Sequence, residues 1–227
     1  MKRAIFLLSM GGPDGRQSVR PFLYNLFSDS AILRMPAFIR KPLALFLSYL
    51  RAVTAWHNYK KIGGRSPLLQ NTKQQAAALE KALRDTDPKN DYKCFVGMSY
   101  WRPFIDEGAE EIKKYNPDEI ISLPLYPQHS TATTKPALEE ATKYFPDSIV
   151  KNIDSFYNDD GFVDALVAQI QKNKPEEGEV ILFSAHGLPQ SIVDAGDPYV
   201  RECEETARRL NKKLPEGRAG KLCYQSR

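Results

Sequence analysis

A histidine at the end of an apolar run is the residue of this sequence best suited to chemistry. The run VILFSAHGLP, from Val180 to Pro189, leads a strand-like segment directly into His186 and then into a Gly-Leu-Pro turn. Parallel sheets bind ligands at the carboxyl ends of their strands, so His186 would stand at such an edge. An imidazole titrates near neutral pH and can accept a proton or bind a metal ion. The alternative is a histidine that caps the strand and hydrogen-bonds backbone groups.

Three other loops that follow apolar runs carry residues suited to binding. They come after Ser9, after Met98 and after Leu125, and they contain MGGP, SYWRP and YPQHST. If the strands are parallel, these loops gather with the histidine on one edge of the sheet. Their aromatic, Met, Ser/Thr and Arg side chains suit a large flat apolar ligand with acidic groups. The alternative is that Trp101 and Tyr126 are ordinary core aromatics.

The elements that must position these residues alternate regularly along the chain. Continuous apolar strands alternating with amphipathic helices predict an α/β fold, with parallel sheets covered by helices on both faces. Helices are expected around residues 68–83, 104–112 and 162–170, where apolar side chains recur at three and four positions. The predicted strands are Ala4–Ser9, Cys94–Met98, Glu119–Leu125, Ser148–Ile153, Glu179–Phe183 and Lys221–Tyr224.

The segment from about 31 to 56 departs from this alternation. It is rich in Leu, Phe, Tyr and Trp, and basic residues interrupt it. Pro36 and Pro42 predict that it does not form one long helix. It is either a pair of amphipathic helices packed on the core, or an apolar lip beside a pocket that touches a membrane with its basic residues on the lipid headgroups. The residues expected in such a lip are Phe38, Leu45, Phe46 and Leu50.

Composition excludes several classes of protein. The chain has 227 residues, 42% hydrophobic and 26% charged, with a net charge of +4, which fits one large soluble domain or two modest lobes. No dense basic patch with interleaved aromatics indicates nucleic acid. The three cysteines form no C-x-x-C pair, so a disulfide framework or a zinc cluster is not expected.

The first apolar run is too short for a signal peptide, and no stretch has the length of a membrane-spanning helix. We expect a cytoplasmic protein, and the lip interpretation adds peripheral contact with the inner face of the cytoplasmic membrane.

Seven motifs in order together resemble the ferrochelatase family. They are SMGGPDG, PFLYNLFSD, YKKIGGRSPL, GMSYWRPF, LPLYPQHSTATT, FSAHGLP with the following GDPY, and LCYQSR. They occur in the order of the family, at compatible spacings, from one end of the chain to the other. A single motif of this kind would be weak, whereas seven in order are highly specific.

The resemblance implies two similar α/β lobes with a porphyrin cleft between them, residues 1–146 and an incomplete second lobe at 147–227. The implied reaction is the insertion of Fe²⁺ into protoporphyrin IX, the last step of haem biosynthesis, with His186 as proton acceptor or iron ligand. A neutral imidazole suits both tasks, because two protons must leave the ring nitrogens and water must leave the metal. The residues expected to contact porphyrin are Met10, Tyr59, Ser66, Ser99, Tyr126 and His129.

No cofactor is required by this reaction, in which Fe²⁺ is a substrate. The cysteines lack the spacing of an iron–sulfur cluster, so a cluster is not supported. Met10 and the long lip favour protoporphyrin over coproporphyrin. Two alternatives stay open, a chelatase for another tetrapyrrole or metal and a non-catalytic tetrapyrrole-binding protein.

Two departures from the family pattern bear on activity. Ser99 stands where the family usually has Arg, which removes one polar contact near the pocket. The chain also ends at Arg227, before the family segment whose acidic residue faces the histidine. We therefore expect a truncated chain with little or no chelatase activity on its own.

Overall fold

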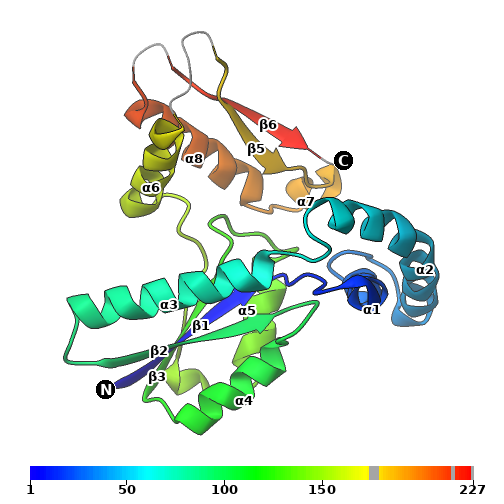
Figure 1. Ribbon diagram of the computed structural model, residues 1–227, viewed down its shortest axis with the longest axis horizontal. Helices are drawn as coiled ribbons and strands as arrows, with labels where there is room; N and C mark the ends of the chain where they lie inside the picture. The colour runs from blue at the N-terminus through cyan, green and yellow to red at the C-terminus, as the bar shows by residue number, and fades with distance from the viewer. Residues whose placement is uncertain (174–178, 216–217, 226–227) are drawn as a thin grey trace. The chain divides into compact units, whose positions relative to one another are not determined.

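The structure, a computed structural model, describes residues 1–173, 179–215 and 218–225 (Figure 1). The chain divides into two compact units. Unit 1 comprises Met1–Leu125 and Thr131–Ile153, and unit 2 comprises Tyr126–Ser130 and Asp154–Arg227. Unit 2 therefore includes a short segment that lies, in the sequence, between two elements of unit 1. The last two residues of the LCYQSR motif lie outside the described residues.

Unit 1 contains a four-stranded sheet in which every neighbouring pair is parallel, as the sequence predicts. The strand order is β2-β1-β3-β4. The strands are β1 (Lys2–Ser9), β2 (Asp91–Met98), β3 (Glu119–Pro124) and β4 (Val150–Asn152), the last preceded by a 3₁₀ turn at Asp147–Ile149. β1 lies between β2 and β3 and is buried from Ala4 to Ser9, which explains the unbroken apolar run from Ala4 to Leu8.

Helices cover both faces of this sheet (Figure 1). Alternate residues of β1 point to opposite faces and therefore contact different helices. Ile5 and Leu7 face α3 (Leu68–Thr86), where Ala76 is buried. Phe6 faces α4 (Ile105–Tyr115) and α5 (Thr134–Thr142). A Cβ at Gly108 of α4 would lie 2.7 Å from the Phe6 ring and from the Val96 carbonyl oxygen, so only glycine permits this close packing.

Two further helices of unit 1, α1 (Arg16–Ser28) and α2 (Ala37–Lys61), pack against each other. The prediction that prolines prevent one long helix is wrong, because α2 runs unbroken for 25 residues. Pro36 is the residue before the helix, where a proline is harmless. Pro42 lies in the second turn, and its missing N–H removes one intrahelical bond. Packing of the later turns against α1 outweighs that local loss.

Unit 2 contains a two-stranded parallel sheet of β5 (Leu182–His186) and β6 (Lys221–Gln225). Its helices are α6 (Asp160–Lys172), the short α7 (Gln190–Asp194) and α8 (Tyr199–Lys213). β5 starts and ends three residues later than the predicted strand, so His186 is its last residue instead of following it. The small core joins Val163 and Val167 of α6 to Leu210 of α8.

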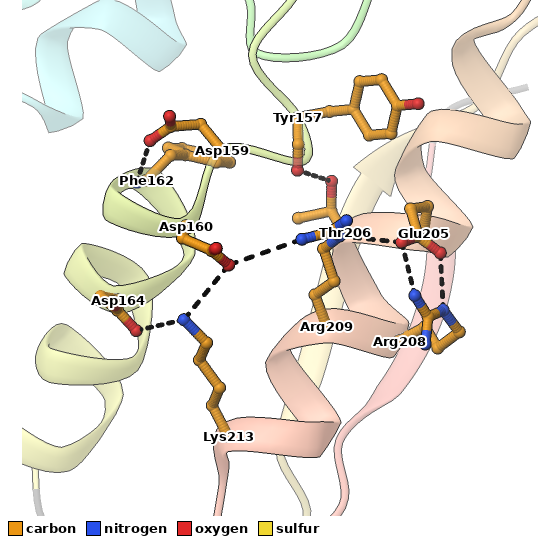
Figure 2. A network of polar contacts seen from close by, with 10 residues as sticks. All are labelled: Tyr157, Asp159, Asp160, Phe162, Asp164, Glu205, Thr206, Arg208, Arg209 and Lys213. Carbon is orange, nitrogen blue, oxygen red and sulfur yellow. Dashed lines mark hydrogen bonds and ion pairs between the residues drawn. The ribbon is translucent and has the colours of Figure 1, made fainter.

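Ion pairs connect α6 to α8 at the surface of unit 2 (Figure 2). Lys213 Nζ lies 2.6 Å from Asp164 and 3.5 Å from Asp160. Within α8, Glu205 contacts both Arg208 and Arg209. Exposed pairs of this kind add little to the free energy of unfolding, so the apolar contacts are what hold the two helices together.

Candidate functional site

The loops after β1 and β2 lie together at the carboxyl edge of the sheet of unit 1, as the parallel strands predict. The expectation that the same sheet edge also carries His186 is wrong, because His186 ends β5 of the separate two-stranded sheet. The Ser99 N–H donates to the Ser9 carbonyl at 2.9 Å, and the Tyr100 N–H donates to the Met10 carbonyl at 3.0 Å. Gly11 has a φ of +82°, and a Cβ there would lie 3.0 Å from the backbone nitrogen of Trp101. The MGGP loop therefore lies directly on the SYWRP loop.

Ser66 lies against the same MGGP loop. Its N–H donates to the Pro13 carbonyl at 2.8 Å, and a Cβ added at Gly12 would lie only 2.5 Å from Ser66 Oγ. The Ser66 Oγ also accepts a bond from the Leu68 N–H at 3.3 Å. The absence of a side chain at Gly12 thus fixes how closely the serine approaches the first loop.

An aromatic cluster completes this side of unit 1. Met10, Tyr59 and Trp101 pack against buried residues of α1 and against Tyr100. Burial raises the pKa of the Tyr59 hydroxyl, which keeps it protonated at neutral pH. The structure thus brings Met10, Tyr59, Ser66 and Ser99 into one unit, with apolar and hydroxyl groups side by side.

His186 presents an exposed imidazole at the end of β5. Its Nδ1 lies 2.8 Å from the Gly187 carbonyl oxygen. Since a carbonyl only accepts, this contact is a hydrogen bond when Nδ1 carries the proton, which leaves the lone pair on Nε2. The backbone N–H of His186 donates to the Tyr199 hydroxyl at 3.2 Å. Burial is the main cause that raises the pKa of Tyr199 to about 12, so this hydroxyl is neutral at physiological pH.

Tyr126 and His129 belong to the short segment of unit 2 that follows β3. Burial raises the pKa of the Tyr126 hydroxyl. The backbone N–H of His129 donates to Glu202 Oε2 at 2.7 Å, and His129 Nδ1 lies 3.3 Å from the Asp154 carbonyl oxygen. Nothing in the sequence singled out Glu202, and its only signal was a helical spacing that puts it on one face with Tyr199 and Thr206.

A cavity of about 450 Å³ lies within unit 2, between the sheet and its two long helices. Its walls are mainly apolar, and His186 is the only predicted site residue among them. Met10, Tyr59, Ser66 and Ser99 belong to unit 1, so their assembly with the histidine into one cleft stays a prediction. The lining residues are Gln128, Leu166, Gln169, Ile170, Asn173, Phe183, Ser184, Ala185, His186, Tyr199, Cys203, Thr206, Ala207, Leu210 and Leu222.

Groups of three or more His, Cys, Asp and Glu side chains able to hold a metal do not occur among residues 1–173, 179–215 and 218–225. All three cysteines are free thiols. Burial is the main cause that raises the pKa of the Cys94 thiol to about 12, which disfavours the thiolate that binds metals.

The outer face of α2 is apolar and exposed. The predicted lip residues Phe38, Phe46, Leu50 and Leu45 are 77%, 63%, 61% and 47% exposed, respectively. Ala44 and Ser48 are buried on the opposite face. Within the described parts of the chain, every helix is too short or too polar to span a membrane.

Comparisons with known proteins agree over the whole chain. The family model named Ferrochelatase matches residues 2–227. A ferrochelatase of Caulobacter vibrioides (strain NA1000 / CB15N) is 43% identical over 231 residues, covering 100% of this chain and 67% of the relative. Ferrochelatases of Phenylobacterium zucineum and of a Wolbachia from Drosophila simulans are also 43% identical, with 68% and 75% of the relative covered.

Proposed function

Because the chain belongs to the ferrochelatase family, we propose that it acts on ferrous iron and protoporphyrin IX, with His186 as the residue that accepts protons or binds the metal. The observation that best supports this role is the 2.8 Å contact from Nδ1 to the Gly187 carbonyl oxygen. That contact favours one tautomer and leaves Nε2 available in a neutral ring. The exposed position of the side chain gives a ligand access to Nε2.

The chemistry requires a base. Inserting a divalent ion into a porphyrin displaces two protons from pyrrole nitrogens, and each needs an acceptor near neutral pH. His186 Nε2 would take such a proton while Nδ1–H stays on the Gly187 carbonyl. We assign Met10, Tyr59 and Tyr126 to apolar contact with the macrocycle. Ser66, Ser99 and His129 would serve its carboxylates as hydrogen-bond donors.

The test measures binding and insertion separately. Binding of protoporphyrin IX is followed by its fluorescence, and insertion of Fe²⁺ is followed without oxygen by the loss of that fluorescence and the appearance of haem absorption. The proteins are residues 1–227, a chimaera that adds the third of the C. vibrioides relative outside the match, and His186→Ala in each. His57→Ala on α2 is the matched control, since His57 is exposed and has no proposed role.

We expect both proteins to bind porphyrin, and the chimaera to insert iron far faster than residues 1–227. His186→Ala would abolish insertion and leave binding largely intact, while His57→Ala would change neither. If the chimaera binds porphyrin but inserts no metal, non-catalytic tetrapyrrole binding replaces the proposal. Preference for another metal or tetrapyrrole would assign the chain a different chelatase activity.

We also propose that the chain works in the cytoplasm and that α2 contacts the inner face of the cytoplasmic membrane. Phe38, Phe46 and Leu50 would enter the headgroup region, and Lys41 and Arg51, both exposed, would meet anionic lipids. Co-sedimentation with anionic vesicles tests this, with Phe46→Ser and Leu50→Ser expected to weaken it. Equal recovery of the variants and the parent with vesicles would exclude the contact.

A further inference from the structure

Two carboxylates are buried at the start of α8, where burial of charge is costly. Glu202 is 5% exposed and Asp197 is 7% exposed. Taking a carboxylate out of water costs several kcal/mol in effective terms unless hydrogen bonds compensate it. The cost is visible at Glu202, since burial is the largest cause that raises its pKa. Hydrogen bonds must therefore compensate the burial of both carboxylates.

Both carboxylates bond to the segment Tyr126–Ser130. Glu202 Oε2 accepts from the His129 backbone N–H at 2.7 Å, across 73 residues of sequence. Asp197 Oδ2 accepts from the Ser130 hydroxyl at 3.0 Å. The other oxygen of Asp197 accepts from the Tyr199 backbone N–H at 2.9 Å, at the first residue of α8. The acidic residues therefore fix the loop that carries His129 to the end of this helix.

The same face of α8 also holds the strand that carries His186. Residues three and four positions apart share a helix face, so Tyr199, Glu202 and Thr206 lie in one row. The Tyr199 hydroxyl accepts from the His186 backbone N–H at 3.2 Å. The Thr206 hydroxyl accepts from Gln128 Nε2 at 3.1 Å and lies 3.1 Å from the Tyr157 carbonyl oxygen. One helix face thus contacts the backbones of both histidines.

We propose that Glu202 is a positioning residue, which sets where His129 lies relative to His186 through the shared face of α8, with Asp197 and Tyr199 supporting it. The inference rests on the proposed function, in which both histidines belong to the tetrapyrrole site. It requires an acceptor at Oε2 and does not require the negative charge. A carboxamide keeps that acceptor, whereas alanine leaves the His129 N–H without it.

The experiment compares Glu202→Ala, Glu202→Gln and Glu204→Ala in the chain of 227 residues. Glu204 is exposed on the same helix, and its replacement by alanine removes the same charge as Glu202→Ala, so Glu204→Ala is the matched control. The readouts are the hydrogen exchange of the His129 amide, followed by NMR, and the dissociation constant for protoporphyrin IX. Tyr199→Phe is a fourth variant, which keeps the ring and removes the acceptor of the His186 N–H.

Leaving a buried N–H without its acceptor changes an equilibrium by about tenfold or more. We expect Glu202→Ala to lose amide protection and porphyrin affinity by at least that factor, and Glu202→Gln to stay within about threefold of the parent. Glu204→Ala should match the parent. Tyr199→Phe should increase exchange at His186 and weaken porphyrin binding, and it provides the test if Glu202→Ala fails to fold.

Unchanged exchange at His129 in folded Glu202→Ala would overturn the proposal. So would a Glu202→Gln variant as impaired as the alanine variant, because the charge and not the acceptor would then matter. A parent chain that binds no protoporphyrin would defeat the proposed function alone, since the exchange of the His129 amide still tests the positioning of the loop.

Discussion

A methyl group added at Gly12 should separate Ser66 from the MGGP loop. The new Cβ would lie 2.6 Å from Ser66 Cβ and 2.5 Å from its Oγ. Cβ belongs to the backbone frame of the serine, so rotation of the side chain does not relieve the overlap. Opening the pair to the 3.4 Å of an ordinary contact takes a movement of about 0.8 Å, which a close-packed interior resists.

That movement has two measurable consequences. Overpacking of this size costs roughly 1–3 kcal/mol in the free energy of unfolding, measured by urea denaturation. It also strains the 2.8 Å bond from the Ser66 N–H to the Pro13 carbonyl. If the Ser66 hydroxyl donates to a porphyrin carboxylate, loss of the bond to the porphyrin raises the dissociation constant by about 10- to 150-fold, the equivalent of ~1.5–3 kcal/mol.

Gly15→Ala is the matched control. It lies in the same loop, it has an extended backbone, and a Cβ there meets nothing within 4 Å. We expect Gly12→Ala to weaken protoporphyrin binding, measured by fluorescence titration, and Gly15→Ala to leave it unchanged. Equal affinities in the two variants, with Gly12→Ala still folded, would refute the assignment of Ser66 to the porphyrin.

Three further predictions concern stability, each measured by urea unfolding. Hydrogen bonds to Arg208, and then to Arg209, lower the pKa of Glu205 to about 2. A lowered pKa stabilises the folded state at pH values above the unfolded pKa of 4.5. Glu205→Gln should therefore be less stable than the parent at neutral pH, and this difference in the free energy of unfolding should vanish as the pH falls from 4.5 toward 2. Burial raises the pKa of Glu202, so this group binds more protons in the folded state than in the unfolded state; the free energy of unfolding of the parent, relative to that of Glu202→Gln, should therefore fall as the pH rises above 4.5. Gly108→Ala should destabilise by roughly 1–3 kcal/mol through its clash with the Phe6 ring, although alanine normally favours a helix; a stabilised variant would contradict the packing of α4.

The strands could be predicted from the sequence because a strand that is buried on both faces appears as a continuous apolar run. A central parallel strand such as β1 is buried on both faces, and its sequence is accordingly apolar at every position from Ala4 to Leu8. The prediction for helix α2 was wrong because it used a local rule about proline. Packing over the length of the helix outweighs that rule, and the residues around Pro42 do not reveal this packing. The shift of β5 by three residues reflects where the partner strand begins, since the register with β6 starts at Leu182 opposite Lys221.

The residues of the site divide in a similar way. His186 ends a strand, Met10 follows one and Ser66 precedes a helix, so local patterns and the family motifs identified them. Glu202 has no such pattern, and its role depends on a bond to a residue 73 positions earlier. A single sequence carries no record of that proximity. An acidic residue on the face of an amphipathic helix that is expected to be buried is the one sequence feature that would have pointed to Glu202.

The membership of Tyr126–Ser130 in unit 2 has a consequence for synthesis on the ribosome. Protein chains grow at about 5–20 residues per second, so a gap of 73 residues corresponds to a delay of roughly 4–15 seconds. At the start of that time strands β1, β2 and β3 of unit 1 are already translated, while the carboxylates that accept bonds from the loop do not yet exist. The loop therefore reaches its final geometry only after α8 emerges, and slow translation between residues 130 and 202 would prolong the interval in which it can be trapped elsewhere.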